Sequence, residues 1–116
     1  MTPLGVKLRA LREEKGVTMS QMAEALEVTS AYLSALEHGK RGRPTTLRLH
    51  QICAYFEIIG DKADGLRRLA DISHPKVTID TSGLSPEATE LANRLAEQIG
   101  ELSEAKIEAM LGTLKR

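Results

Sequence analysis

Apolar residues recur every three or four positions through most of this chain, which is the spacing that places them on one face of a helix. Five such segments fill the first 72 residues, and two more follow residue 85. The apolar positions of the first five segments form the predicted core: Leu4, Leu8, Leu11, Met22, Ala23, Leu26, Leu33, Leu36, Leu49, Ile52, Cys53, Phe56, Ala63, Leu66, Leu69 and Ala70. Aromatic residues make up only 3% of the chain and strand-forming runs are scarce. The pattern therefore predicts an all-α protein.

Residues 18–38 are the most informative stretch, because they predict two short helices joined by a tight turn. Thr18 and Gln21 have the spacing of a capping box, in which the hydroxyl accepts from a backbone donor and the amide reaches back. Thr29, or the serine after it, is the N-cap candidate of the second helix. Gly39 is expected to end that helix in the left-handed conformation.

This spacing resembles the helix-turn-helix of the xenobiotic-response-element family, to which lambda repressor and Cro belong. The residues that carry the resemblance are Ala23, Leu26, Val28, Leu33, Leu36, Glu37 and Gly39. It extends from about Leu4 to Asp71 and implies the family's five-helix bundle. Two positions differ: Met19 stands where the family often has Gln, and Glu27 occupies a turn position that often carries glycine. A side chain in that left-handed turn costs on the order of 1 kcal/mol.

The resemblance implies double-stranded DNA as the ligand, because in the family the second helix of the motif lies in the major groove. The residues implied to face base edges are Thr29, Ser30, Ala31, Tyr32, Ser34 and Ala35. Met19 and Ser20 are implied to meet backbone phosphate. His38 is either a phosphate contact or a solvent-exposed side chain, and Tyr32 either touches DNA or packs against the bundle. The second helix carries no Arg, Gln or Asn, so we expect methyl contacts to thymine and readout of DNA shape.

Charge is distributed unevenly, although the whole chain has a net charge of zero. Residues 1–72 carry eleven Lys and Arg against nine Asp and Glu, whereas residues 73–116 carry five against seven. Lys40, Arg41 and Arg43 form a basic run directly after the second helix of the motif. We predict that these cations hold the DNA backbone, or that one arginine reads a guanine. An ordinary solvated run of charges is the alternative.

Residues 73–84 are expected to form a linker or a short strand. Polar and apolar residues alternate from Lys76 to Asp80, which is typical of a half-buried strand. A single strand has no partner within the chain, and even a two-stranded pairing is marginally stable. The segment is therefore either an extended linker or one half of a pairing between two molecules.

Residues 85–116 predict an amphipathic helical hairpin, opened by Ser85 and Pro86 and capped again at Ser103. Two helices in a hairpin cannot bury both of their apolar faces, so they either fold back on the first domain or pair with a second copy. We expect a homodimer, in which two motifs about 34 Å apart would read a palindrome. The residues expected at the dimer interface are Val77, Ile79, Leu91, Leu95, Ile99, Ile107, Met110, Leu111 and Leu114.

Catalytic chemistry is weakly supported by the sequence. The three histidines are far apart and none has metal-ligand spacing. His50 and Cys53 are three residues apart on one predicted helix, but Cys53 lies in the apolar face, which favours a buried and inert thiol. The segment from Gly39 to Gly42 lacks the strand and glycine spacing of a phosphate-binding loop. We therefore expect no catalytic residue, no metal and no cofactor.

The sequence as a whole predicts a sequence-specific transcriptional regulator that binds duplex DNA, acts as a repressor and forms a dimer. Its expected domains are a helix-turn-helix domain over residues 1–72, the linker over 73–84 and the hairpin over 85–116. No apolar stretch is long enough for a membrane span, and a single cysteine fits a reducing cytoplasm. The alternative is an adaptor or antitoxin that uses its C-terminal helices to bind a partner protein.

Overall fold

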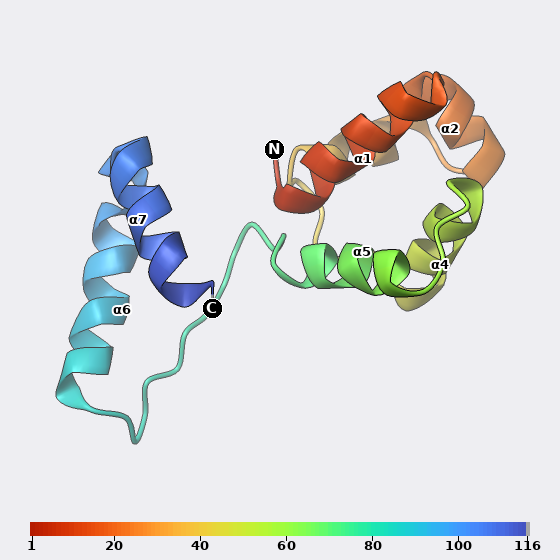
Figure 1. Cartoon of the computed structure of the whole chain (residues 1–116). Coiled ribbons are helices and arrows are strands. Elements are labelled where there is room, and N and C mark those ends of the chain that lie inside the picture. Colours follow the sequence, from red (N-terminus) through yellow and green to blue (C-terminus); the bar gives the residue numbers. More distant parts are fainter. Residues whose placement is uncertain (116) are drawn as a thin grey trace. The chain divides into compact units, whose positions relative to one another are not determined.

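The computed structural model describes residues 1–115 and divides into two compact units, Met1–Val77 and a second unit from Thr78 onward (Figure 1). Within these residues the secondary structure consists of seven α-helices and one 3₁₀ turn, with no strand. This confirms the all-α prediction. Arg116, the last residue of the predicted hairpin, lies outside the described residues.

The first unit is a bundle of five helices. Helix α1 packs against α3 and α5, and α2 packs against α3 and α4. The bounds of the helices are α1 Pro3–Lys15, α2 Met19–Leu26, α3 Ser30–Glu37, α4 Thr46–Tyr55 and α5 Asp61–Asp71. Each of the five contributes buried apolar side chains to one continuous core. Fully burying a leucine or isoleucine stabilises a fold by about 1.5–3 kcal/mol, so this shared core is the main source of the unit's stability.

Threonine side chains start four of these five helices. Thr2, Thr18, Thr29 and Thr45 each accept, through the hydroxyl, a hydrogen bond from the backbone N–H three residues later. At Thr18 the Gln21 side chain also accepts from the threonine N–H at 2.8 Å, which confirms the predicted capping box. Each such cap is worth about 1 kcal/mol. Helix α5 is the exception, because it begins after Gly60 without a side-chain cap.

The second unit contains α6 (Pro86–Gln98), a 3₁₀ turn (Ile99–Glu101) and α7 (Glu104–Leu114). The two helices run in opposite directions (Figure 1), as the predicted hairpin requires. Ser85 and Ser103 cap them, accepting from Ala88 N–H at 3.1 Å and from Lys106 N–H at 3.3 Å. Helix α6 ends at Gln98, where the chain tightens into the 3₁₀ turn.

The segment between the helical parts begins inside the first unit. The hydroxyl oxygen of Ser73 accepts a hydrogen bond from the Leu4 backbone N–H at 2.9 Å, and Ser73 is buried. From His74 to Asp80 every residue is exposed. The Ser73 hydrogen bond therefore links the end of α5 to the start of α1. The exposed segment that leads to α6 begins after Ser73.

Candidate nucleic-acid interface

Helices α2 and α3 form a corner whose inner side is fixed by the core. Leu33 and Leu36 of α3 are buried together with Met22 and Leu26 of α2. The turn between the helices is made by Glu27, which has the left-handed backbone angles φ 57° and ψ 42°. This confirms the conformation expected at that position. The corner consequently holds α3 by one face and leaves the opposite face open.

The open face of α3 is built from short side chains. Ser30 and Ala31 are exposed, and Ser34 and Ala35 are half-buried. The Thr29 hydroxyl accepts from the Tyr32 N–H at 3.0 Å, so this candidate base contact also caps its own helix. Short side chains allow the helix backbone to come close to a surface, but they offer few hydrogen bonds with which to read it.

Tyr32 organises two cations beside this face. The Arg41 guanidinium lies 5.1 Å and the Arg48 guanidinium 5.6 Å from the centre of the Tyr32 ring, both within cation–π range. Arg48 also donates to the Leu26 carbonyl oxygen at 3.3 Å and to Gln51 Oε1 at 2.9 Å. The half-buried Tyr32 therefore positions charge next to α3. Arg48 was not among the predicted contacts, although it lies in the acid-free stretch between His38 and Phe56.

The predicted basic run does not behave as a single group. Lys40 and Arg41 are exposed, whereas Arg43 is half-buried and donates through Nε to Asp71 Oδ1 at 2.6 Å. Arg43 also donates to the Pro44 carbonyl oxygen at 3.2 Å. Its charge is therefore partly compensated inside the first unit, and the cations available to a ligand are Lys40, Arg41 and the neighbouring Arg48.

The remaining candidate contacts lie at the helix ends. Ser20 is exposed at the start of α2, and Met19 is half-buried and packs against the core. The first turn of a helix leaves N–H groups without intrahelical partners, which is a favourable place for a phosphate. His38, exposed after α3, has Nδ1 2.8 Å from the Ser34 carbonyl oxygen, a contact that requires the proton on Nδ1.

A buried ion pair ties α3 to α1. The Glu37 carboxylate, 2% exposed, accepts from Arg12 Nη2 at 3.1 and 3.0 Å and from Arg9 Nε at 3.4 Å. Gly5 permits this approach, because a Cβ there would lie 2.1 Å from the Glu37 carbonyl oxygen. The helical pattern of the sequence did not predict this pair. The sequence does contain an indication of the pair: Glu37 follows Leu33 by four residues, a spacing that places its carboxylate on the inner face of the same helix.

A family model for the helix-turn-helix domain matches residues 3–72, which is more than half of the chain. The chain belongs to the helix-turn-helix domain family. The match covers all five helices of the first unit and confirms the resemblance inferred from the sequence. From here on, Met1–Val77 is called the helix-turn-helix unit.

Three similar proteins come from Bacillus subtilis (strain 168). The chain is 38% identical to the HTH-type transcriptional repressor RghR over 58 residues, covering 50% of this chain and 43% of RghR. It is 34% identical over 58 residues to the uncharacterized HTH-type transcriptional regulator RghRB, covering 50% and 42%, and 29% identical over 55 residues to the HTH-type transcriptional regulator SinR, covering 47% and 50%. The chain thus spans half or less of these relatives. A solved SinR protein/SinI protein complex matches with a TM-score of 0.47 and 24% identity over 97% of this chain and 94% of that one.

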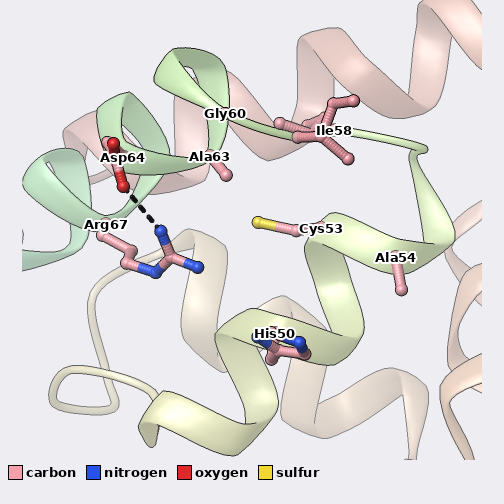
Figure 2. Close-up of a pocket in the computed structure, with 9 residues that line it drawn as sticks. His50, Cys53, Ala54, Ile58, Gly60, Ala63, Asp64 and Arg67 are labelled. Carbon is pink, nitrogen blue, oxygen red and sulfur yellow. Dashed lines mark hydrogen bonds and ion pairs between the residues drawn. The ribbon is translucent and has the colours of Figure 1, made fainter.

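A cavity of about 440 Å³ lies on another side of the helix-turn-helix unit, between α4 and the start of α5 (Figure 2). The Cys53 side chain points toward Ala63, and its thiol is buried. At the rim, Arg67 Nη1 donates to Asp64 Oδ1 at 2.8 Å, while His50 is exposed.

Among residues 1–115, no group of three His, Cys, Asp or Glu side chains is placed to hold a metal ion. None of the described helices has the length and apolar content needed to span a bilayer.

Proposed function

We propose that this chain is a transcriptional regulator that binds duplex DNA, with α3 in the major groove. The observation that carries the proposal is the open face of α3, which lies beside Lys40, Arg41 and Arg48 while its opposite face is held by the core. The relatives RghR and SinR are named as transcriptional regulators, which supports the same function.

In this proposal, α3 makes few hydrogen bonds to base edges and depends on its backbone coming close to the DNA. The hydroxyls of Ser30 and Ser34 can donate to or accept from base edges, and the methyl groups of Ala31 and Ala35 can pack against thymine methyls. Thr29 and Tyr32 flank this face. Since long bidentate side chains are absent from α3, sequence-dependent DNA shape supplies a further part of the specificity.

Phosphate contacts supply most of the affinity. Lys40 and Arg41 are exposed, and Arg48 is held beside α3 by the Tyr32 ring. Each phosphate neutralised by a cation contributes about 0.9 to the slope of log affinity against log salt. Arg43 contributes less than the sequence suggests, because Asp71 already compensates its charge.

We further propose that the protein acts as a dimer and a repressor. The second unit exposes apolar side chains at the positions expected for a dimer interface, among them Leu91 at 65%, Ile99 at 55% and Leu114 at 79%. A second copy would remove this surface from water. The repressor assignment is supported by the name of RghR, the relative with 38% identity.

The test is equilibrium binding to a duplex selected from a random pool, and to the DNA upstream of the gene, at several salt concentrations. We expect Arg41→Ala and Arg48→Ala to weaken binding uniformly across sequences and to reduce the salt slope by about one unit each. The matched control is Arg94→Ala, which removes an exposed arginine of α6 and should leave binding unchanged. Wild-type protein that ignores every duplex at low salt would contradict the proposal.

A second candidate function is binding to a different protein through the second unit. The observation that favours it is the same exposed apolar surface of α6 and α7, which a heterologous partner can cover as well as a second copy. Wild-type protein that binds no duplex, but forms a complex of defined ratio with another protein through this surface, would favour the adaptor, whereas binding of both a duplex and a partner protein would favour the antitoxin.

A further inference from the structure

Residues 76–80 form an exposed segment with an unusual symmetry in its sequence. The segment is Lys-Val-Thr-Ile-Asp, and residues 77–80 lie in neither a helix nor a turn (Figure 1). Val77 is 74% and Ile79 is 59% exposed, so two apolar side chains face water on a stretch that has unpaired backbone groups available for strand pairing. Lys76 and Asp80 stand at equal distances from the central Thr78 and carry opposite charges.

This arrangement is complementary to itself when two copies run antiparallel. With Thr78 on the twofold axis, Lys76 of each copy lies opposite Asp80 of the other, and Val77 lies opposite Ile79. Side chains alternate between the two sides of a strand, so the four apolar residues share one side and both ion pairs lie on the other. Cross-strand apolar pairs and opposite charges both stabilise an antiparallel ladder.

Other registers lose this complementarity. A slip of two residues places Lys76 opposite Thr78 or Ser82 and separates both ion pairs, while a slip of one residue moves the apolar side chains to opposite sides of the ladder. Pro75 has no N–H to donate, so the pairing cannot continue far beyond Lys76. The side chain and the backbone N–H of Ser82 hold the pKa of Asp80 below its ordinary value, and this carboxylate is charged at neutral pH with or without that shift.

We propose that residues 76–80 pair antiparallel with the same residues of a second copy, with Thr78 on the twofold axis. The proposal rests on the proposed homodimer and names its register. Thr78 lies five positions after the buried Ser73, a distance of about 17 Å when the chain is fully extended. The two Ser73 positions are then at most about 34 Å apart, so this pairing keeps the two helix-turn-helix units of a dimer close together.

Disulfide trapping of the full chain tests the register directly. In a Cys53→Ala background, which removes the native thiol, Thr78→Cys places the two new thiols opposite each other at a Cα separation of about 4.5–5.5 Å, within disulfide range. The matched controls Lys76→Cys and Asp80→Cys place theirs four residues apart along the ladder, about 14 Å, which is too far. We expect the Thr78 variant to give most of the covalent dimer on mild oxidation. Equal yields from all three variants, or none at Thr78, would overturn the proposal.

Charge exchange provides an independent readout without any disulfide. Lys76→Asp and Asp80→Lys each place like charges across both symmetric pairs, and we expect each to raise the dimer dissociation constant on the order of tenfold. The double variant restores opposite charges and should return to within about threefold of wild type. A double variant that is as weak as the sum of the two single changes would overturn the pairing.

The same samples separate failure of the register from failure of the proposed function. If the protein is a dimer that binds duplex DNA, yet neither the cysteine yields nor the charge exchange follow this pattern, the register is wrong and the DNA-binding function stands. If the wild type stays monomeric and ignores every duplex, the proposed function fails with it.

Discussion

The helix-turn-helix unit and the second unit bury their apolar residues to very different extents. In the first, side chains such as Leu4, Leu49 and Ile52 are at most 1% exposed. In the second, the described residues of α6 and α7 include no buried side chain; Leu95 is half-buried, and the exposed large apolar residues range from 36% at Ile107 to 79% at Leu114. Both regions have the same helical periodicity, so periodicity predicts a helix but does not say what covers it.

The difference has an energetic consequence. Helices of 13 and 11 residues are marginal in water unless packing stabilises them. The helix-turn-helix unit supplies that packing from within, whereas the hairpin leaves most of its apolar surface exposed. We therefore expect the first unit to fold independently of protein concentration and the second to depend on association. The two tyrosines, Tyr32 and Tyr55, lie in the first unit and the chain has no Trp, so tyrosine fluorescence follows that unit alone.

We expect the largest difference in stability between the two units from a glycine-to-alanine substitution made once in each unit. Gly5→Ala in α1 puts a methyl group 2.1 Å from the Glu37 carbonyl oxygen, so α1 and α3 must separate. We expect it to lower the free energy of unfolding of the first unit by about 3 kcal/mol or more, measured by tyrosine fluorescence in urea. Gly112→Ala in α7 meets nothing within 4 Å and should instead strengthen its helix by about 0.5–1 kcal/mol. A neutral Gly5→Ala would show that the helices are not in close contact.

Ion pairs sharpen the same comparison. Glu37→Gln leaves the Arg12 guanidinium without its carboxylate in a nearly closed environment, and we expect a loss of about 2–3 kcal/mol in the first unit. Glu90→Gln removes an exposed carboxylate that Arg94 meets at 2.6 Å on α6, and should change stability by less than about 0.5 kcal/mol. Helical circular dichroism in urea follows both units, whereas tyrosine fluorescence follows only the first; equal losses of stability in the two variants would contradict the assignment of one pair as buried and the other as solvated.

The features that the sequence predicted well depend on neighbouring residues. The capping box at Thr18, the N-cap at Thr29 and the left-handed conformations at Glu27 and Gly39 involve groups no more than five residues apart. Helical periodicity likewise identified the buried faces, although Leu11, Phe56 and Leu69 are only partly buried. Local chemistry decides these features before the chain is packed.

The features that the sequence did not predict join distant segments. Arg12 meets Glu37, Arg43 meets Asp71, and the Ser73 side chain meets the Leu4 backbone 69 residues away. Each of these contacts depends on how the five helices cross, which no local pattern states. In the candidate interface the consequence is that Arg48 joins the cations near α3, while Arg43 is compensated.

Exposed apolar residues offer a third test of the difference between the units. Leu91→Asp places a charge on the apolar face of α6, where 65% of Leu91 is exposed, and we expect it to raise the dimer dissociation constant at least tenfold. Val6→Asp changes a side chain of α1 that is 58% exposed and should leave dimerisation unchanged. Analytical ultracentrifugation over a range of concentrations measures both. If the two variants behave alike, the second unit is not the interface.

The smallest effect concerns two glutamates of the helix-turn-helix unit that share one strained conformation. Glu27 and Glu57 both have φ 57°, so replacing either by glycine relieves an unfavourable backbone, and we expect each change to stabilise the unit by about 0.5–1 kcal/mol. They differ in position, because Glu27 precedes α3 whereas Glu57 follows α4.

Only Glu27→Gly removes a negative charge beside the proposed DNA surface. It should therefore raise duplex affinity a few-fold at low salt, while Glu57→Gly leaves affinity unchanged and neither variant alters dimerisation. Parallel measurements of urea unfolding, duplex binding and sedimentation separate these effects. Equal gains in affinity would mean that the gain comes from stability rather than from charge, and that α3 does not face the DNA.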